Sequence, residues 1–178
     1  RSACAAMVKT GRSTILLDAG PGTIRRMLEA GFSIFDLDYI CLSHFHPDHC
    51  SELVPILFSN KYTGSIQRLK PLTLIGGTGL KKFFYNLTVV FGHWIELGPD
   101  LFRLIELDTQ GPDTFTGPDF SLKSAPVVHQ NESIAMRIYG PMDKSVVYSG
   151  DTDYCMGLIA LAEGAEVFIC EAAFPDTQ

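Results

Sequence analysis

The stretch SHFHPDHC at positions 43–50 constrains this chain more than any other, because it holds three of the five histidines within six positions. It follows LDYICLS (37–43), whose apolar residues predict a buried strand, so His44 stands at the end of that strand. Histidine is the commonest side-chain metal ligand, and imidazole combined with carboxylate suits zinc, iron or manganese. We set aside the alternative, solvated loop histidines, because of this density and because Asp48 is interleaved with them. The chain is therefore expected to bring a strand end to a metal.

Length and composition limit the class of protein. The 178 residues, 46% hydrophobic and 19% charged, predict one soluble globular domain spanning 1–178. No apolar run approaches the roughly 18 residues of a membrane span. The net charge of −6 argues against a broad nucleic-acid footprint. Five cysteines without a CxxC pair favour neither a disulfide framework nor a cysteine-based zinc knuckle, so we expect a cytoplasmic protein.

Short strands and helices alternate along the chain without an internal repeat. Helices are predicted at 23–31, at 78–87 with Thr78 as a candidate cap, and near 154–165. Strands are predicted at 5–9, 13–19, 37–43, 71–77, 94–97, 102–107, 120–128, 133–140, 145–151 and 166–172, whereas 109–119 is expected to be turns. So many adjacent strands do not fit a purely parallel doubly wound sheet. The pattern therefore favours an α/β fold of two packed sheets with outer helices.

Donors for two metal ions can be chosen from the spacing. His44 and His46 can converge on one metal, while Asp48 and His49 face a second. Asp151 follows the strand-like VVYSG, and its two carboxylate oxygens can each take one cation. His129 ends the stretch SAPVV, and by itself a lone histidine there is more often a bland surface or core residue than a ligand.

The series LLDAGPGT, SHFHPDH, VVHQNESIAMRI, VVYSGDTD and FICEAAF resembles the metallo-β-lactamase fold superfamily, and within it the branch of ribonuclease Z and its phosphodiesterase relatives. The resemblance covers residues 1 to about 175 in the right order. It implies an αββα four-layer sandwich, in which two packed mixed sheets are flanked by helices. The histidine motif is specific for the superfamily and much less so for the substrate.

The resemblance also implies a ligand set. His44, His46 and His129 would hold the first of two divalent metals, Asp48 and His49 the second, and Asp151 would bridge them. We expect zinc, although manganese or iron suits the same ligands. Supporting positions beside the site are implied for Asp18 and Glu171, and Asp18 has a turn-capping role as an equal alternative.

Three departures from the family pattern bear on this expectation. The family's last histidine ligand would lie beyond Gln178 and its first strand before Arg1, so we expect a fragment of a longer protein, truncated at both termini. The family's His-Glu-Ala-Thr stretch reads Cys-Glu-Ala-Ala at 170–173, which weakens a ribonuclease-specific role. Only 21 residues separate His129 from Asp151, with two cations among them, so the family's basic arm for transfer RNA has no room.

These observations predict a metal-dependent hydrolase. We expect a metal-bridging hydroxide to attack phosphorus in a small phosphodiester, with Asp48 also orienting the hydroxide or accepting its proton. A nucleic-acid substrate is not favoured, and the family suggests a homodimer. Hydrolysis of a lactone, thioester or sulfate ester on the same centre is an alternative, because the nucleophile does not select its electrophile. A non-catalytic scaffold of the same fold is another, supported by the departures at Cys170 and Ala173.

Overall fold

Two five-stranded sheets organise residues 4–62 and 67–172, the part of the chain that the computed structural model describes. In the first sheet β1 pairs antiparallel with β2, and the remaining pairs are parallel. Its strands, in spatial order, are β1 (Ala6–Lys9), β2 (Thr14–Leu17), β3 (Tyr39–Leu42), β4 (Leu72–Gly76) and β5 (Phe102–Glu106).

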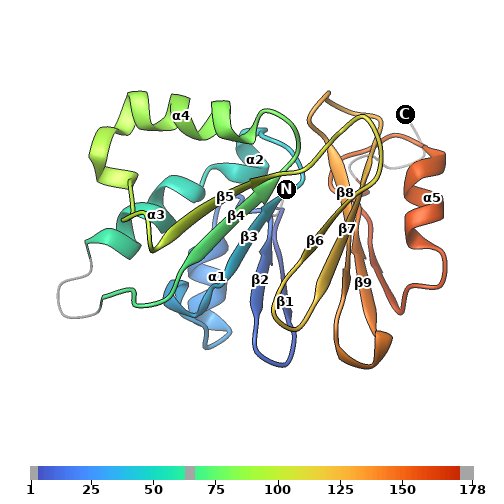
Figure 1. Ribbon diagram of the computed structural model, residues 1–178, viewed down its shortest axis with the longest axis horizontal. Coiled ribbons are helices and arrows are strands. Elements are labelled where there is room, and N and C mark those ends of the chain that lie inside the picture. Colours follow the sequence, from blue (N-terminus) through green and yellow to red (C-terminus); the bar gives the residue numbers. More distant parts are fainter. Residues whose placement is uncertain (1–3, 63–66, 173–178) are drawn as a thin grey trace.

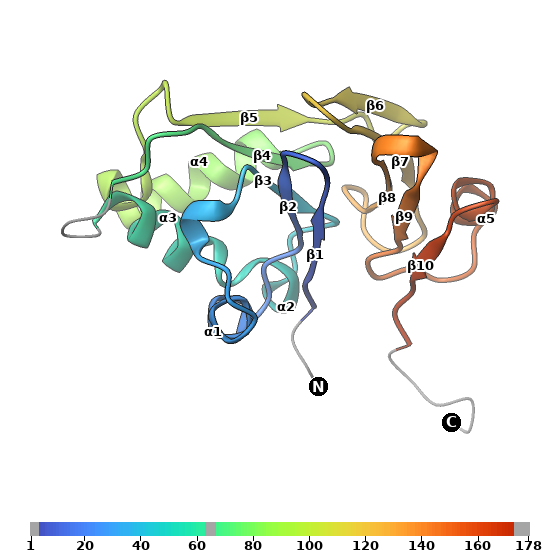
Figure 2. The ribbon, with the colours of Figure 1, turned by 90° about the horizontal axis from the view of Figure 1, so that it is seen from below.

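The second sheet is antiparallel except for its last pair, β9 with β10. Its strands are β10 (Val167–Ile169), β9 (Ser145–Tyr148), β8 (Ile134–Tyr139), β7 (Ser121–Pro126) and β6 (Asp113–Thr116) in spatial order. In Figure 2, β5 of the first sheet and β6 of the second lie along the same edge of the molecule. Both sheets are therefore mixed, as the superfamily resemblance predicts.

Helices cover the outer faces of the two sheets. Figure 1 shows α3 and α4 on one outer side and α5 on the other, with both sheets between them. The helices are α1 (Thr23–Glu29), α2 (Pro47–Cys50), α3 (Leu53–Lys61), α4 (Leu80–Phe91) and α5 (Met156–Ala162), with 3₁₀ turns η1 (Ile34–Asp36), η2 (Gly92–Ile95) and η3 (Pro141–Asp143). No helix in residues 4–62 or 67–172 is long and apolar enough to cross a membrane.

Alternation along the strands builds separate apolar layers, because successive side chains point to opposite faces of a sheet. In β2, Leu16 joins the core under the helices, whereas Ile15 and Leu17 face the second sheet. The same division places Ile40 on the helical side and Cys41 between the sheets. A third cluster lies between the second sheet and α5. The four layers of the predicted αββα sandwich are thus confirmed.

Three local predictions are wrong. Residues 94–97 do not form a strand: Gly92 takes φ +58 at the end of α4, and the chain turns through η2 instead. Thr78 does not cap α4, because Gly79 occupies the N-cap with φ +98 and no side-chain cap, and the Thr78 hydroxyl donates to Leu107 O at 3.4 Å. In addition, β6 forms inside the stretch 109–119, which we expected to be turns.

Candidate metal centre

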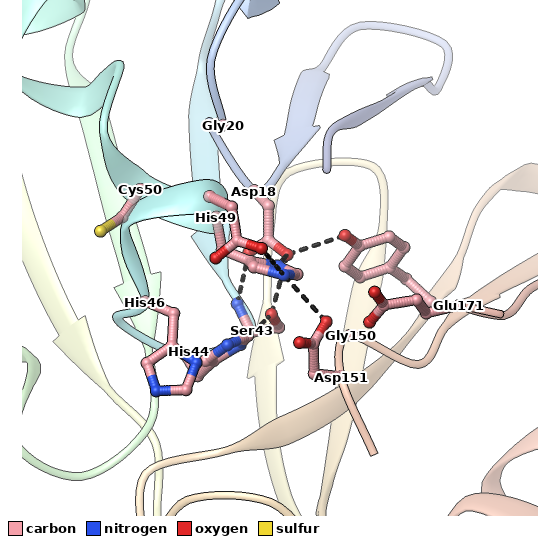
Figure 3. Close-up of polar contacts among 12 residues, drawn as sticks. Asp18, Gly20, Ser43, His44, His46, His49, Cys50, Gly150, Asp151 and Glu171 are labelled. Atoms are coloured by element: carbon pink, nitrogen blue, oxygen red, sulfur yellow. Dashed lines mark hydrogen bonds and ion pairs between the residues drawn. The ribbon is translucent and has the colours of Figure 1, made fainter. Parts of the chain in front are cut away.

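The clustered histidines leave β3 at its carboxyl end and are held by the short helix α2. Pro47 occupies the first turn of α2, where its fixed φ suits a helix start, and His46 is the N-cap residue. This turn buries His49 and leaves Asp48 partly exposed. Figure 3 shows His44, His46 and His49 directed toward the region where Asp151 enters from the loop after β9.

Four side chains from distant positions form a first group. One ligand atom from each of His44, His46, His129 and Asp151 lies within 4.8 Å of the others. Nδ1 of His46 is 3.1 Å from Nε2 of His129, and the same His129 atom is 3.8 Å from Oδ2 of Asp151. The backbone holds this approach in place, since Asp153 N–H donates to Val128 O at 2.9 Å. The structure thus brings His129 to the histidine motif.

A second group forms on the other side of Asp151. Its Oδ1 lies 2.8 Å from Nε2 of His49, and that nitrogen is 3.9 Å from Oδ2 of Asp48. The two oxygens of Asp151 therefore face different groups, Oδ2 toward His129 and Oδ1 toward His49.

Unpartnered buried atoms test whether this arrangement fits a metal. Among the described residues, Nε2 of His44, Nε2 of His49 and Oδ1 of Asp151 are buried without a hydrogen-bond partner, so the 2.8 Å approach of His49 to Asp151 lacks hydrogen-bond geometry. Leaving one such group unsatisfied costs about 1–3 kcal/mol. Divalent cations, one at each group, would satisfy all three, because imidazole nitrogen and carboxylate oxygen are their usual donors. The residues present fit a metal.

Asp18 is the buried anion behind the histidines. It is fully buried and follows β2 with φ +58. Its Oδ1 accepts from Ser43 N–H at 2.7 Å. Its Oδ2 accepts from Ser43 Oγ at 2.8 Å and from Tyr148 Oη at 2.7 Å, and lies 2.7 Å from His49 Nδ1 (Figure 3). The side chain therefore links β3, α2 and β9 and does not merely cap its own turn.

These contacts decide which nitrogen of each histidine carries the proton. Because Asp18 is an acceptor, Nδ1 of His49 donates to it and Nε2 keeps its lone pair for the site. Ser43 Oγ donates to Asp18 and lies 3.0 Å from Nδ1 of His44, so it accepts from that nitrogen. Both buried histidines consequently present a free Nε2 toward Asp151. Sequence reasoning missed Ser43 and Tyr148, which carry no motif of their own.

Burial and neighbouring charge shift the two histidines in opposite directions. Burial, followed by the nearby His49, lowers the pKa of His44 to about 3, which keeps its imidazole neutral. Burial also lowers the pKa of His49, but the hydrogen bond and charge of Asp18 outweigh it, so the net pKa is raised. For Asp151, burial opposes ionisation, yet a hydrogen bond with Glu171 and the adjacent histidines hold its pKa below the usual value.

Two glycines allow the loops to meet at the site. A Cβ on Gly20 would lie 2.0 Å from Asp48 O, so only glycine permits this approach of the loop after β2 to α2. Gly150 has φ +59, and a Cβ there would lie 2.6 Å from Ser43 Cβ. Neither position tolerates a side chain without moving the candidate ligands beside it.

Two further side chains border the second group. Glu171, expected as a supporting residue, contacts Asp151, and its backbone N–H donates to Ser149 Oγ at 3.2 Å. Ala173 lies outside the described residues. Cys4, which sequence reasoning missed because a lone cysteine carries no signal, groups with Asp48 and His49. Burial, then the charges of Glu171 and Asp151, raise the pKa of the Cys4 thiol to about 11.

Comparison with known proteins places the chain in a family. Residues 3–178 match the sequence model of the family described as Anti-Pycsar protein Apyc1. Ribonuclease Z of Clostridium acetobutylicum is 34% identical over 129 residues, which cover 70% of this chain and 40% of that protein. Ribonuclease Z of Agathobacter rectalis is 26% identical over an alignment of 220 residues, which covers 96% of this chain and 69% of the relative. The chain thus spans only part of the length of these relatives.

Solved structures share the same architecture. The metallo-β-lactamase fold protein YhfI from Bacillus subtilis matches with a TM-score of 0.78 and 24% identity, over 99% of this chain and 66% of that one. The short form of human tRNase Z matches with a TM-score of 0.77 and 21% identity, over 100% and 74% of the two chains. This protein therefore belongs to the Anti-Pycsar protein Apyc1 family, within the ribonuclease Z-like branch of the metallo-β-lactamase fold superfamily.

Proposed function

We propose that this protein hydrolyses phosphodiester bonds at a dinuclear divalent-metal centre. The observation that carries the proposal is the position of Asp151, whose two oxygens face separate groups of donors. A carboxylate placed in this way can bridge two cations. The relatives named ribonuclease Z support the phosphodiester class, since a ribonuclease acts on such bonds.

Each metal would have its own set of protein donors. The first would be held by His44, His46, His129 and one oxygen of Asp151, and the second by Asp48, His49 and the other oxygen. Bound zinc, manganese or iron would lower the pKa of water and neutralise charge that develops on the phosphoryl oxygens. Zinc is our first choice among these metals.

The protein's own groups would position the donors and move a proton. Asp18 accepts the hydrogen bond from Nδ1–H of His49, so the imidazole keeps both its orientation and its free Nε2. The Asp48 side chain is 46% exposed and its Oδ2 lies 3.9 Å from Nε2 of His49, at the edge of the cluster. From this position Asp48 can orient the attacking water and accept its proton, which is the catalytic role we assign to it.

The surroundings of the site favour a small substrate. The segment between His129 and Asp151 is occupied by β8, η3 and β9, which join directly. Arg137, in β8, is buried and donates to Ser145 Oγ and to the carbonyls of Leu161 and Glu163. It is therefore not available to phosphates of a nucleic acid. The pocket beside His129, about 610 Å³, has the size typical of small-molecule sites.

Metal content and substrate preference together test the proposal. We would measure metal per chain and turnover of a chromogenic phosphodiester, a lactone and a thioester for the wild type, Asp151→Asn and Asp153→Asn. Asp153 is the matched control: it lies in the same loop, and its Oδ1 accepts from Tyr154 N–H at 2.7 Å. We expect two metals per chain and a preference for the phosphodiester, both lost in Asp151→Asn and kept in Asp153→Asn.

Each other outcome assigns a different function. A clear preference for the lactone or the thioester would mean that the same centre hydrolyses another class of ester. Fewer than two metals per wild-type chain, with no turnover, would contradict the dinuclear centre and favour the alternative of a non-catalytic scaffold protein of the same fold. Full turnover in Asp151→Asn would contradict the bridging role of this carboxylate.

A further inference from the structure

Cys4 lies beside the second donor group. Its Sγ, one oxygen of Asp48 and one ring nitrogen of His49 all lie within 4.8 Å of one another. The same sulfur lies within 4.8 Å of a carboxylate oxygen of Asp151 and one of Glu171. Cys4 is thus common to two clusters of possible ligand atoms, one with Asp48 and His49 and the other with Asp151 and Glu171.

The backbone fixes Cys4 at this place. Gly20 N–H donates to Cys4 O at 3.2 Å, two residues before β1 begins. A Cβ on Gly20 would lie 3.0 Å from Cys4 N and 2.0 Å from Asp48 O, so three chain segments converge at this glycine. Close packing of the backbone at Gly20 therefore brings the segments that carry Cys4 and Asp48 together.

An independent observation points to a ligand at the same spot. The His49 side chain is 1% exposed, and its Nε2 has no hydrogen-bond partner among the described residues. This atom belongs to the residue that groups with Cys4 and Asp48. An unpartnered buried nitrogen, a carboxylate and a thiol around one point form a donor set typical of zinc.

We propose that Cys4 is a protein ligand of the second metal, so that this site has a sulfur donor beside Asp48, His49 and Asp151. The inference rests on the proposed dinuclear centre and adds a ligand to it. A thiolate selects zinc over manganese or magnesium, which prefer oxygen donors. The second site is then the zinc-selective one of the two, because the first group contains no sulfur.

Cobalt(II) titration of the metal-free protein tests this directly, because a bound thiolate gives a charge-transfer band in the near ultraviolet. The titration would compare the wild type, Cys4→Ser and Cys155→Ser. Cys155 is the matched control: it is a partly buried free thiol outside the donor groups found in the described residues. We expect the band in the wild type and in Cys155→Ser, and its loss in Cys4→Ser with at least one cobalt still bound.

Alkylation of the wild type gives a second readout that does not depend on a variant. Bound zinc should protect Cys4 from iodoacetamide and leave the labelling of Cys155 unchanged, as measured by mass spectrometry of peptides. Two bound cobalt ions without the band, or a band that survives in Cys4→Ser, would overturn the inference and leave the dinuclear centre intact. A wild type that binds fewer than two cobalt ions and shows no zinc protection would overturn both.

Discussion

Replacing the buried carboxylate of Asp18 by an amide, in Asp18→Asn, should weaken metal binding although Asp18 lies behind the ligands. Asparagine tolerates the left-handed backbone at φ +58, so the loop itself is not strained. The change removes the charge and one acceptor from a group that faces four donors, including Ser43 Oγ, His49 Nδ1 and Tyr148 Oη.

The magnitude follows from these contacts. If the amide oxygen takes the place of Oδ2, three donors remain satisfied, but each hydrogen bond to a charged acceptor becomes a neutral one and loses about 1 kcal/mol. The amide N–H₂ then opposes Ser43 N–H, at the place of Oδ1. The smaller desolvation cost of an amide offsets part of this, which leaves a loss of about 1–3 kcal/mol in the free energy of unfolding.

Metal affinity should fall as well, because His49 Nδ1 then donates to a neutral amide oxygen instead of a carboxylate, which holds its tautomer and orientation less strongly. Removing such an outer partner of a ligating histidine lowers metal affinity about 10–100-fold. This range corresponds to about 1.4–2.7 kcal/mol of binding free energy. The expected loss of metal-binding free energy is therefore of the same order as the expected loss in the free energy of unfolding.

Competition with a chromophoric chelator measures the affinity, and urea unfolding of the metal-free protein measures the stability. Asp38→Asn is the matched control, because Asp38 precedes β3, whereas Asp18 faces the far end of that strand. Asp38 accepts from Thr14 N–H at 2.9 Å and from Lys70 Nζ at 2.7 Å. We expect that control to lose some stability without losing metal affinity. Wild-type affinity in Asp18→Asn would refute the view that this carboxylate orients the histidine.

Three other perturbations have defined outcomes. Gly150→Ala should lower the free energy of unfolding by more than the roughly 1–2 kcal/mol of left-handed strain, because its Cβ would meet Ser43 Cβ at 2.6 Å. The same clash should reduce the metal content per chain. Gly31→Ala is the control: Gly31 has φ +81 and open space around it, so this variant should show the strain alone. Equal metal content in both would contradict the steric argument. Burial opposes ionisation of Asp119, but hydrogen bonds from Ser13 and Thr10 outweigh it and lower its pKa from 3.8. The stability that ionised Asp119 contributes is therefore present above pH 3.8 and lost as pH falls through the lower pKa of the folded state. In acid unfolding experiments, the free energies of unfolding of wild type and Asp119→Asn should therefore differ above pH 3.8 and become equal below the folded pKa. Zinc at 1,000 times its dissociation constant should raise the free energy of unfolding by about 4 kcal/mol, and a chelator should reverse this in thermal melts.

Elements with strong local patterns could be predicted from the sequence. The alternation of Leu16 with Ile15 and Leu17 is set by the geometry of an extended chain and appears as a two-faced apolar strand before any partner is known. The predicted strand at 94–97 does not form because Gly92, two residues before it, has φ +58 and redirects the chain into η2. Strand β6 was missed because its turn-rich sequence is overridden by pairing with β7.

The sequence by itself determined the dense donors of one loop, since His44, His46, Asp48 and His49 are neighbours whatever the rest of the chain does. Only the tertiary structure decided that other segments meet this loop, because contacts between distant residues depend on strand pairing, register and the packing of two sheets. The position of Asp151 between the two donor groups, the four contacts of Asp18 and the approach of Cys4 all belong to this second kind. A local pattern records which side chains are available, whereas the fold decides which of them lie close enough together to share a metal.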